Sequence, residues 1–354
     1  MLCYHIYKLK SLAQFNVLSG IPTMRNIRSL LRQTHRFACF MMMLCFAGVS
    51  FAETPHVAAD IAPVHSLVAR VMDGVGAPSL IIAPGASPHE YSLRPSEAAA
   101  LQHADVIFWI GPDLTPWLDD AMSTLADDAV IISLLKARGT TLLPYRDSAL
   151  FERHDHDGDH NDHSEHADHD DHSDHANHDD DGQGHIDPHL WLSPDNGMAW
   201  LNHIAEVLAE ADPANAAAYR ANAAAGQTEL AKLQAEINAV LKPHRGKNFI
   251  LFHDGFQYFE HHFDVPSRGA IAFSDASQPG PARLAAIRGR ITDDAITCVL
   301  SEPQYQPGII AAVTVNAEVN IGVVDAIGYD RVLGRDLYPQ LLRGVAEALA
   351  ECLK

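Results

Sequence analysis

The chain has 354 residues, of which 47% are hydrophobic, enough for two ordinary domains with a core each. Its formal net charge is −20, but residues 154–185 contribute eleven Asp, one Glu and no Lys or Arg, which leaves −8 for the remainder. A moderately acidic remainder argues against a nucleic-acid-binding protein.

The first segment, residues 1–52, is predicted to be a signal segment rather than part of the fold. "MRNIRSLLRQTHR" supplies a basic start, "FACFMMMLCFAGV" a short apolar run, and Ser50 and Ala52 the small residues that a signal peptidase requires. Met24 is the expected true start, because residues 1–23 would make the basic region unusually long. An uncleaved membrane anchor is the alternative, although the apolar run is short for a bilayer. We therefore expect export to an oxidising compartment.

Residues 53–150 alternate short β-branched runs with helical stretches, which predicts an N-terminal lobe built on a mainly parallel sheet. After a first strand near residue 57, strands are expected at residues 78–84, 105–111 and 128–134. Residues 188–211 are predicted to complete this lobe with a helix.

Residues 212–243 are rich in Ala, Glu and Leu, which predicts one long linking helix of roughly seven to eight turns. Residues 244–354 then repeat the alternation as a C-terminal lobe. Its strands are expected at 247–254, 265–273, 296–302 and 320–328, and its helices at 255–263, 281–291, 307–319 and 337–353. The predicted architecture is two α/β lobes joined by a stiff helix, with the ligand in the cleft between them.

Residues 151–187 interrupt the N-terminal lobe with a tract rich in His and Asp. Apart from two alanines, residues 154–185 contain no apolar side chain to build a core, so we expect the tract to be disordered without metal. It is predicted to be an accessory loop that captures or buffers divalent ions; a solvated acidic linker is the alternative. Its histidines are His154, His156, His160, His163, His166, His169, His172, His175, His178 and His185.

Two of the five cysteines, Cys298 and Cys352, remain after the signal segment is removed. Two cysteines in an exported domain most often form a disulfide, which here would staple the last helix to the C-terminal sheet. Two separate buried thiols are the alternative.

Four polar residues lie at or just after strand-like runs, two in each half of the chain: His89, His189, His253 and Asp325. Three imidazoles and a carboxylate are a ligand set that suits tetrahedral Zn²⁺. Any one of these residues alone would be read as a hydrogen-bonded loop or core residue, but four around one cleft make a zinc site the better interpretation. Asp254 is a candidate acceptor for the second ring nitrogen of His253.

The segments "GASPHEYSLRPSE", "DPHLWLSP", "FHDGFQYFE" and "VVDAIG" resemble the motifs of cluster A-I substrate-binding proteins of metal ABC importers. The resemblance covers residues 54–354 and is closest to the periplasmic zinc-binding components of high-affinity zinc uptake systems. It implies the TroA-like fold of the helical-backbone metal receptors, which has two (βα)₄-type lobes bridged by a rigid helix.

The resemblance also implies that His89, His189 and His253 are zinc ligands and that Asp325 is the matching aspartate of the C-terminal lobe. Manganese-specific members typically place a glutamate at the position of His253, and harder oxygen ligands suit Mn²⁺, so the imidazole favours Zn²⁺. The family's usual Pro-Leu-Gly after the aspartate is replaced here by Ala-Ile-Gly. Glu90 or water is the alternative fourth ligand.

The function implied is capture of Zn²⁺ in the periplasm and delivery to an inner-membrane ABC permease. A separate ATPase subunit is expected, because the chain contains no nucleotide-binding loop motif. We expect a monomer and no nucleic-acid partner. A manganese receptor or metal-dependent adhesin of the same family is one alternative. A zinc hydrolase is the other, although no H-E-x-x-H helix is present.

Overall fold

The computed structural model describes residues 54–146, 186–272, 279–304 and 307–354. The predicted signal segment and nearly all of the His-rich tract lie outside these ranges, so both stay predictions. Residues Glu53–Lys354 form one compact unit. The expected lobe boundaries within that unit also stay predictions.

The N-terminal lobe contains a four-stranded parallel sheet in the order β2-β1-β3-β4. Its strands are β1 (Val57–Ala59), β2 (Ser79–Leu80), β3 (Val106–Trp109) and β4 (Val130–Ser133). The helices between them are α2 (Ala62–Val71), α3 (Pro95–Gln102) and α4 (Pro116–Leu125), and the short 3₁₀ turn η1 (Leu134–Lys136) follows β4. A 3₁₀ turn, η2 (Leu190–Leu192), and helix α5 (Pro194–Ala211) come next in the described chain.

The C-terminal lobe repeats the same strand order, β6-β5-β7-β8, and is also parallel. Its strands are β5 (Phe249–His253), β6 (Ala270–Ala272), β7 (Cys298–Ser301) and β8 (Asn320–Val323). Its helices are α7 (Gln257–Phe263), α8 (Pro281–Asp293), α9 (Pro307–Thr314) and α10 (Leu337–Cys352). These two sheets confirm the prediction of a two-lobed α/β protein.

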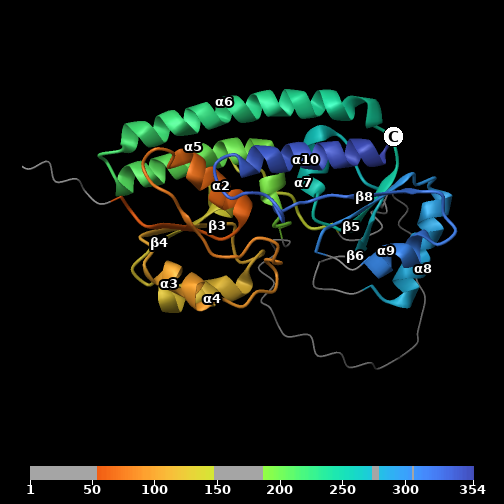
Figure 1. The fold of residues 1–354 in the computed structure, drawn as a ribbon, viewed down its shortest axis with the longest axis horizontal. Helices are drawn as coiled ribbons and strands as arrows, with labels where there is room; N and C mark the ends of the chain where they lie inside the picture. Colours follow the sequence, from red (N-terminus) through yellow and green to blue (C-terminus); the bar gives the residue numbers. More distant parts are fainter. Residues whose placement is uncertain (1–53, 147–185, 273–278, 305–306) are drawn as a thin grey trace, which may run out of the picture. The chain divides into compact units, whose positions relative to one another are not determined.

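In the chain, the two lobes are linked by α6 (Ala216–Leu241), a helix of 26 residues that is followed by a 3₁₀ turn, η3 (Lys242–His244). This helix confirms the predicted long link. Figure 1 shows α10 lying beside α6, and α10 packs both on α2 of the first lobe and on β7 and β8 of the second. The lobes are therefore braced by two helices, where the sequence predicted one.

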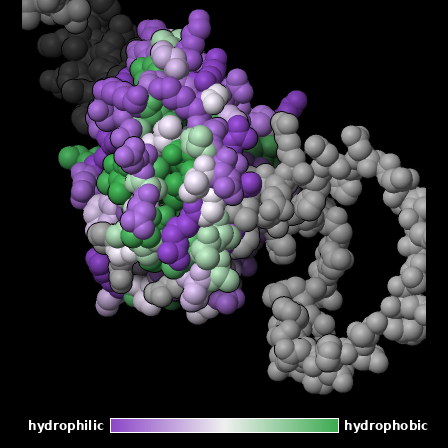
Figure 2. Space-filling model, turned by 90° about the vertical axis from the view of Figure 1, so that its right-hand side faces the viewer, coloured by the Kyte–Doolittle hydropathy of each residue, from purple (hydrophilic) through white to green (hydrophobic). Residues whose placement is uncertain are grey.

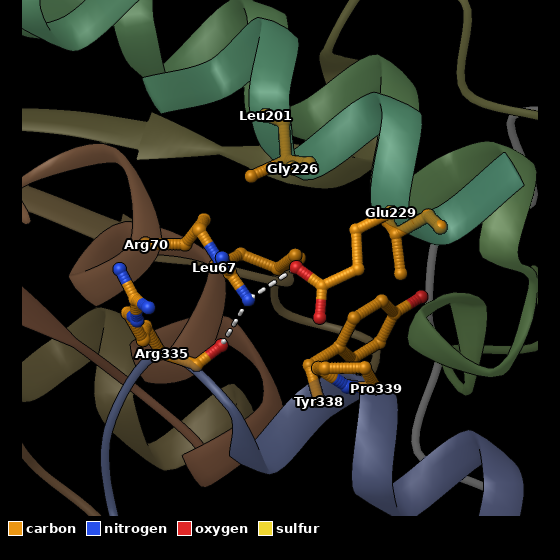
Figure 3. Close-up of a pocket in the computed structure, with 9 residues that line it drawn as sticks. Leu67, Arg70, Leu201, Gly226, Glu229, Arg335, Tyr338 and Pro339 are labelled. Atoms are coloured by element: carbon orange, nitrogen blue, oxygen red, sulfur yellow. Dashed lines mark hydrogen bonds and ion pairs between the residues drawn. The ribbon is translucent and has the colours of Figure 1, made fainter. Parts of the chain in front are cut away.

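The N-terminal end of α10 is held by a network of ion pairs around a small cavity (Figure 3). Arg70 on α2 pairs with Glu229 on α6 at 2.6 Å and donates to the carbonyl of Arg335 at 3.5 Å. It also pairs with Asp336, just before α10, at 3.2 Å. The other end of α10 is tied to β7 by the disulfide Cys298–Cys352, which confirms that prediction. One connected hydrophobic core runs through both lobes and these helices, so the lobes pack as one body.

Prolines start α3, α4, α5 and α8, where the missing N–H costs no helical hydrogen bond. Two expected elements are shorter than predicted. Strand β2 has two residues, although the N–H groups of Ile81 and Ile82 beyond it still donate to the carbonyls of Ala59 and Asp60. Helix α9 stops at Thr314 rather than at residue 319, because Asn316 adopts φ 63°, a conformation that ends helices.

Figure 2 views the side of the unit opposite the N-terminal lobe and shows a mainly hydrophilic surface broken by an apolar area. Ile321 and Val323 on β8, the edge strand of the C-terminal sheet, are 56% and 59% exposed. None of the helices in the described ranges combines the length and the apolar character needed to cross a bilayer.

Candidate metal centre

A small cavity lies where the two lobes meet, and three of the four predicted ligands line it. The space open to the centre of a water-sized sphere is about 20 Å³, enough for one ion or water molecule. The lining residues are Ala86, Ser87, Pro88, His89, His189, Trp191, His253, Glu302, Gln304, Ala326 and Ile327. The expected convergence of motifs from both halves of the chain is thus present in the structure.

His253 is the last residue of β5, so it stands at the carboxyl edge of the C-terminal sheet. Its Nδ1 lies 2.5 Å from Oε1 of Glu302, which directly follows the neighbouring strand β7. Both side chains are buried, at 4% and 2% exposure. Because a carboxylate only accepts hydrogen bonds, Nδ1 carries the proton and Nε2 presents its lone pair.

His189 is held in the same way from the N-terminal lobe. It immediately precedes η2, and its Nδ1 lies 2.7 Å from Oδ1 of Asp187, which also accepts the backbone N–H of His189 at 3.0 Å. Asp187 is 1% exposed. The carboxylate fixes the ring orientation and leaves Nε2 as the lone-pair nitrogen. The turn itself is held across the lobes, since the indole N–H of Trp191 donates to the carbonyl of Ala326 at 2.7 Å.

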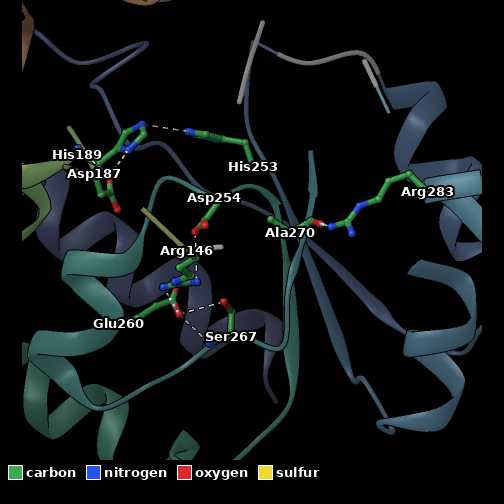
Figure 4. A network of polar contacts seen from close by, with 9 residues as sticks. All are labelled: Arg146, Asp187, His189, His253, Asp254, Glu260, Ser267, Ala270 and Arg283. Atoms are coloured by element: carbon green, nitrogen blue, oxygen red, sulfur yellow. Dashed lines mark hydrogen bonds and ion pairs between the residues drawn. The ribbon is translucent and has the colours of Figure 1, made fainter. Parts of the chain in front are cut away.

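The two lone-pair nitrogens face each other, as Figure 4 shows, with Nε2 of His189 3.4 Å from Nε2 of His253. Two nitrogens bonded at 2.0–2.1 Å to one tetrahedral Zn²⁺ lie about 3.3–3.4 Å apart. Two lone pairs at this distance repel each other unless a cation or a proton lies between them. The geometry is therefore that of two ligands arranged for a shared cation.

His89 lies in the loop between β2 and α3 and is only half-buried. Its ring centroid is 5.5 Å from that of His189, close to the 5.2 Å between His189 and His253. The loop is held by the indole N–H of Trp117, which donates to the carbonyl of Pro88 at 2.9 Å. Within the described ranges, no three or more His, Cys, Asp or Glu side chains lie together in a way that could hold a metal ion, so the two-histidine arrangement does not extend to a third ligand in this structure.

Asp325 follows β8 after Val324, but its carboxylate contacts its own loop. Oδ1 accepts the backbone N–H groups of Ile327, Gly328 and Tyr329 at 3.1, 2.7 and 3.0 Å. Arg331 lies 3.7 Å from Oδ2. The two residues after Asp325, rather than Asp325 itself, line the cavity.

Beneath the site, Arg146 bridges two buried carboxylates (Figure 4). Its Nη1 is 3.2 Å from Asp254 and its Nη2 is 3.0 Å from Glu260. Burial raises the pKa of Asp254 to about 6, while the Arg146 charge acts in the opposite direction. Asp254 pairs with Arg146. The sequence suggested Asp254 as the acceptor for His253, but in the structure that acceptor is Glu302.

Sequence reasoning missed four residues of this centre. Asp187 and Glu302 hold the imidazoles of His189 and His253, and Arg146 pairs with the residue after His253. Gly255 packs on the His253 ring so closely that a Cβ there would lie 2.3 Å from Nε2. One signal was available: Glu302 directly follows a buried strand, the same criterion that selected His253.

Comparisons with known proteins show the family to which the chain belongs. A family model described as zinc-uptake complex component A, periplasmic, matches residues 57–352. The high-affinity zinc uptake system protein ZnuA of Brucella abortus (strain 2308) is 42% identical over 338 residues, which cover 93% of this chain and 99% of that protein.

Two solved structures share the fold, although below 25% identity they show the fold alone. A crystal structure of ZnuA covers 85% of this chain and 100% of its own, with a TM-score of 0.67 and 22% identity. A mutant structure of a laminin-binding adhesin from Streptococcus agalactiae has the same coverage, a TM-score of 0.66 and 19% identity. The family model and the sequence relative cover nearly the whole described chain, and the chain belongs to the periplasmic zinc-uptake complex component A (ZnuA) family.

Proposed function

We propose that this protein captures Zn²⁺ with His89, His189 and His253 and delivers it to an inner-membrane ABC permease. The observation that carries the proposal is the 3.4 Å separation of two Nε2 atoms whose partner nitrogens both face carboxylates. Membership of a family of periplasmic zinc-uptake components supports the same reading, and makes the protein a binding protein rather than a zinc hydrolase.

The chemistry of the donors favours Zn²⁺ over Mn²⁺. Neutral imidazole is a good ligand for Zn²⁺, whereas Mn²⁺ prefers carboxylate, carbonyl and water oxygens. The cavity brings three imidazoles together, and its one lining carboxylate, Glu302, is engaged with His253. The shared fold does not decide between the metals, because it also occurs in a Pseudomonas aeruginosa binding protein solved in complex with Mn²⁺.

The fourth bond to the ion is assigned to water or to Asp325. Asp325 would have to exchange backbone N–H partners for the metal, since its Oδ1 accepts three of them. Glu90, the other alternative, is exposed. If Asp325 is a ligand, Asp325→Ala should weaken Zn²⁺ binding as strongly as His89→Ala; if water is the ligand, the loss should stay within about ten-fold.

The His-rich tract is proposed to be an accessory element that raises the local Zn²⁺ concentration near the cleft. Deleting residues 154–185 should leave the tight site intact and remove only weakly bound ions. Metal analysis beside calorimetry on the full-length and deleted proteins measures both quantities. Loss of tight binding in the deleted form would make the tract part of the primary site.

The partners and location proposed follow from the family, whose members are periplasmic components of zinc uptake. The N-terminal signal segment would export the protein, which would act as a monomer with a permease and a separate ATPase. Cell fractionation and cleavage-site sequencing would test the export.

The decisive experiment measures Zn²⁺ affinity by competition with a chromophoric chelator for the wild type and for His253→Ala. The variant should lose tight binding, because one of the two preset ligands is gone. Full affinity in His253→Ala would refute the assigned site. Parallel titration with Mn²⁺ separates a zinc receptor from a manganese receptor.

A further inference from the structure

The chain leaves for the His-rich tract and returns from it at a clasp built against α7. Pro144 and Ile186 form an isolated antiparallel bridge, and the N–H of Asp187 donates to the carbonyl of Leu143 at 2.9 Å. The N–H of Leu143 in turn donates to the hydroxyl of Tyr258 on α7 at 2.9 Å. Residues 143–146 and 186–189, named here the clasp, are therefore held together at one place on either side of residues 147–185.

The returning half of the clasp holds one ligand. Asp187 binds His189 through Oδ1, while its Oδ2 faces Gln257 on α7. With the Gln257 amide oriented to satisfy its neighbours, its nitrogen donates to Asp187 Oδ2 at 2.9 Å and to the carbonyl of Pro144 at 3.1 Å. The Asp187 carboxylate thus contacts His189 through one oxygen and Gln257 of α7 through the other.

The departing half of the clasp reaches the other ligand. The two nitrogens of the Arg146 guanidinium pair separately with Asp254 and Glu260, a fork that a guanidinium supplies and an ammonium does not. The side chains of Asp254 and Glu260 are 7% and 5% exposed, and Glu260 also accepts the N–H and the hydroxyl of Ser267. Without the guanidinium, the buried carboxylates of Asp254 and Glu260 would lie near each other with no positive charge between them. Asp254 directly follows His253 in the chain.

The turn that begins with Asp254 follows His253 directly in the chain and lies close to its imidazole. Gly255 lies against the imidazole, at a distance where even a Cβ would come within 2.3 Å of Nε2. A shift of the turn away from Glu260 therefore displaces the ring from its partner His189. Arg146, far away in the sequence, is in this way connected to the metal-binding nitrogen.

We propose that Arg146 is a positioning residue for Zn²⁺ binding: it acts through Asp254 to hold His253, and the clasp couples the base of the tract to the site. This inference rests on the proposed function. Outer partners of metal-binding histidines typically contribute 10–100-fold to metal affinity, and we expect a loss in that range when the guanidinium is removed.

The test compares Arg146→Met and Arg146→Lys with the wild type and with Arg220→Met, which breaks an exposed pair with Glu206 between α5 and α6. Arg146→Met should weaken Zn²⁺ binding 10–100-fold and change the visible d–d bands of the Co²⁺-loaded protein. Arg146→Lys should recover part of the affinity, because it keeps the charge but not the fork. Arg220→Met should behave as wild type.

A second measurement needs no variant. Because coupling is reciprocal, saturating Zn²⁺ should slow hydrogen exchange at the amides of Leu143 and Asp187 in the wild-type protein. Unchanged exchange, or an Arg146→Met protein with wild-type affinity and Co²⁺ spectrum, would overturn the inference and leave Arg146 a structural residue. Failure of the proposed function is distinguishable, because His253→Ala would then also retain tight binding.

Discussion

Gly255→Ala is the sharpest test of the proposed centre, because it adds a methyl group beside His253 and leaves every proposed metal-binding side chain in the sequence. The new Cβ would lie 2.3 Å from Nε2 of His253 and 2.7 Å from Cε1. Carbon contacts of this kind need about 3.5 Å, so the ring or the turn must move by about 1 Å. Gly255 is not among the residues with positive φ, so backbone strain does not contribute.

A displacement of that size exceeds the tolerance of about 0.2 Å in metal–ligand distances. The ring cannot rotate away freely, because Glu302 holds its Nδ1 and Phe256 packs at its edge, 6.1 Å between centroids. We expect Zn²⁺ affinity to fall at least 100-fold, or about 2.8 kcal/mol at 1.4 kcal/mol per factor of ten. Overpacking should also destabilise the metal-free protein by about 1–3 kcal/mol.

The assay is chelator competition at pH 7.5, with thermal unfolding of the metal-free protein measured beside it. Gly280→Ala is the matched control, because a Cβ at that position meets no atom within 4 Å and its φ is −71°. Wild-type affinity in Gly255→Ala would refute the reasoning that His253 binds the ion through Nε2 in this orientation.

Three further predictions concern the same structure. Glu302→Gln should weaken Zn²⁺ binding by 10–100-fold in the competition assay, because the amide no longer holds the Nδ1 proton of His253 as a carboxylate does; an unchanged affinity would remove Glu302 from the site. Zn²⁺ affinity should fall as pH drops below about 6.5, the ordinary pKa of histidine, since protons compete for imidazole; a dissociation constant that stays flat from pH 8 to 5 would contradict histidine ligation. Replacing both Cys298 and Cys352 by Ser should lower the free energy of unfolding by about 4 kcal/mol, as expected for a cross-link with a sequence separation of 54. Urea unfolding measures this quantity, and unchanged stability would show that the cross-link does not constrain the unfolded chain.

The sequence predicted the parts of this molecule that depend on local pattern and on the geometry of parallel sheets. The carboxyl ends of parallel strands share an edge, so His253 could be placed at the cleft from its position at the end of a hydrophobic run. The long Ala-rich stretch predicted α6 for the same kind of reason. Helix α10 was predicted at residues 337–353, but its role as a second brace was not, because periodicity identifies an amphipathic helix without naming what it packs on.

Asp325 shows where pattern reasoning about a site stops. A carboxylate after a strand can face the cleft or its own backbone, and the strand pattern is the same in both cases. A local signal was present, however: Gly328 follows three residues later with φ 88°, and Asp followed by such a Gly typically accepts backbone N–H groups of the turn. Arg146 had no comparable signal, because its partners lie more than a hundred residues away.

The electrostatics of the centre explain why such a site favours a dication. Asp187 and Glu302 are 1% and 2% exposed, and in each the hydrogen bond to an imidazole leaves a buried negative charge next to the cavity. One Zn²⁺ between the two Nε2 atoms would neutralise two negative charges, whereas a monovalent cation would neutralise one. Buried charges are costly until they are paired, so binding a dication relieves a cost that the metal-free protein carries. Affinity here follows from the two carboxylates behind the ligands as well as from the imidazoles themselves.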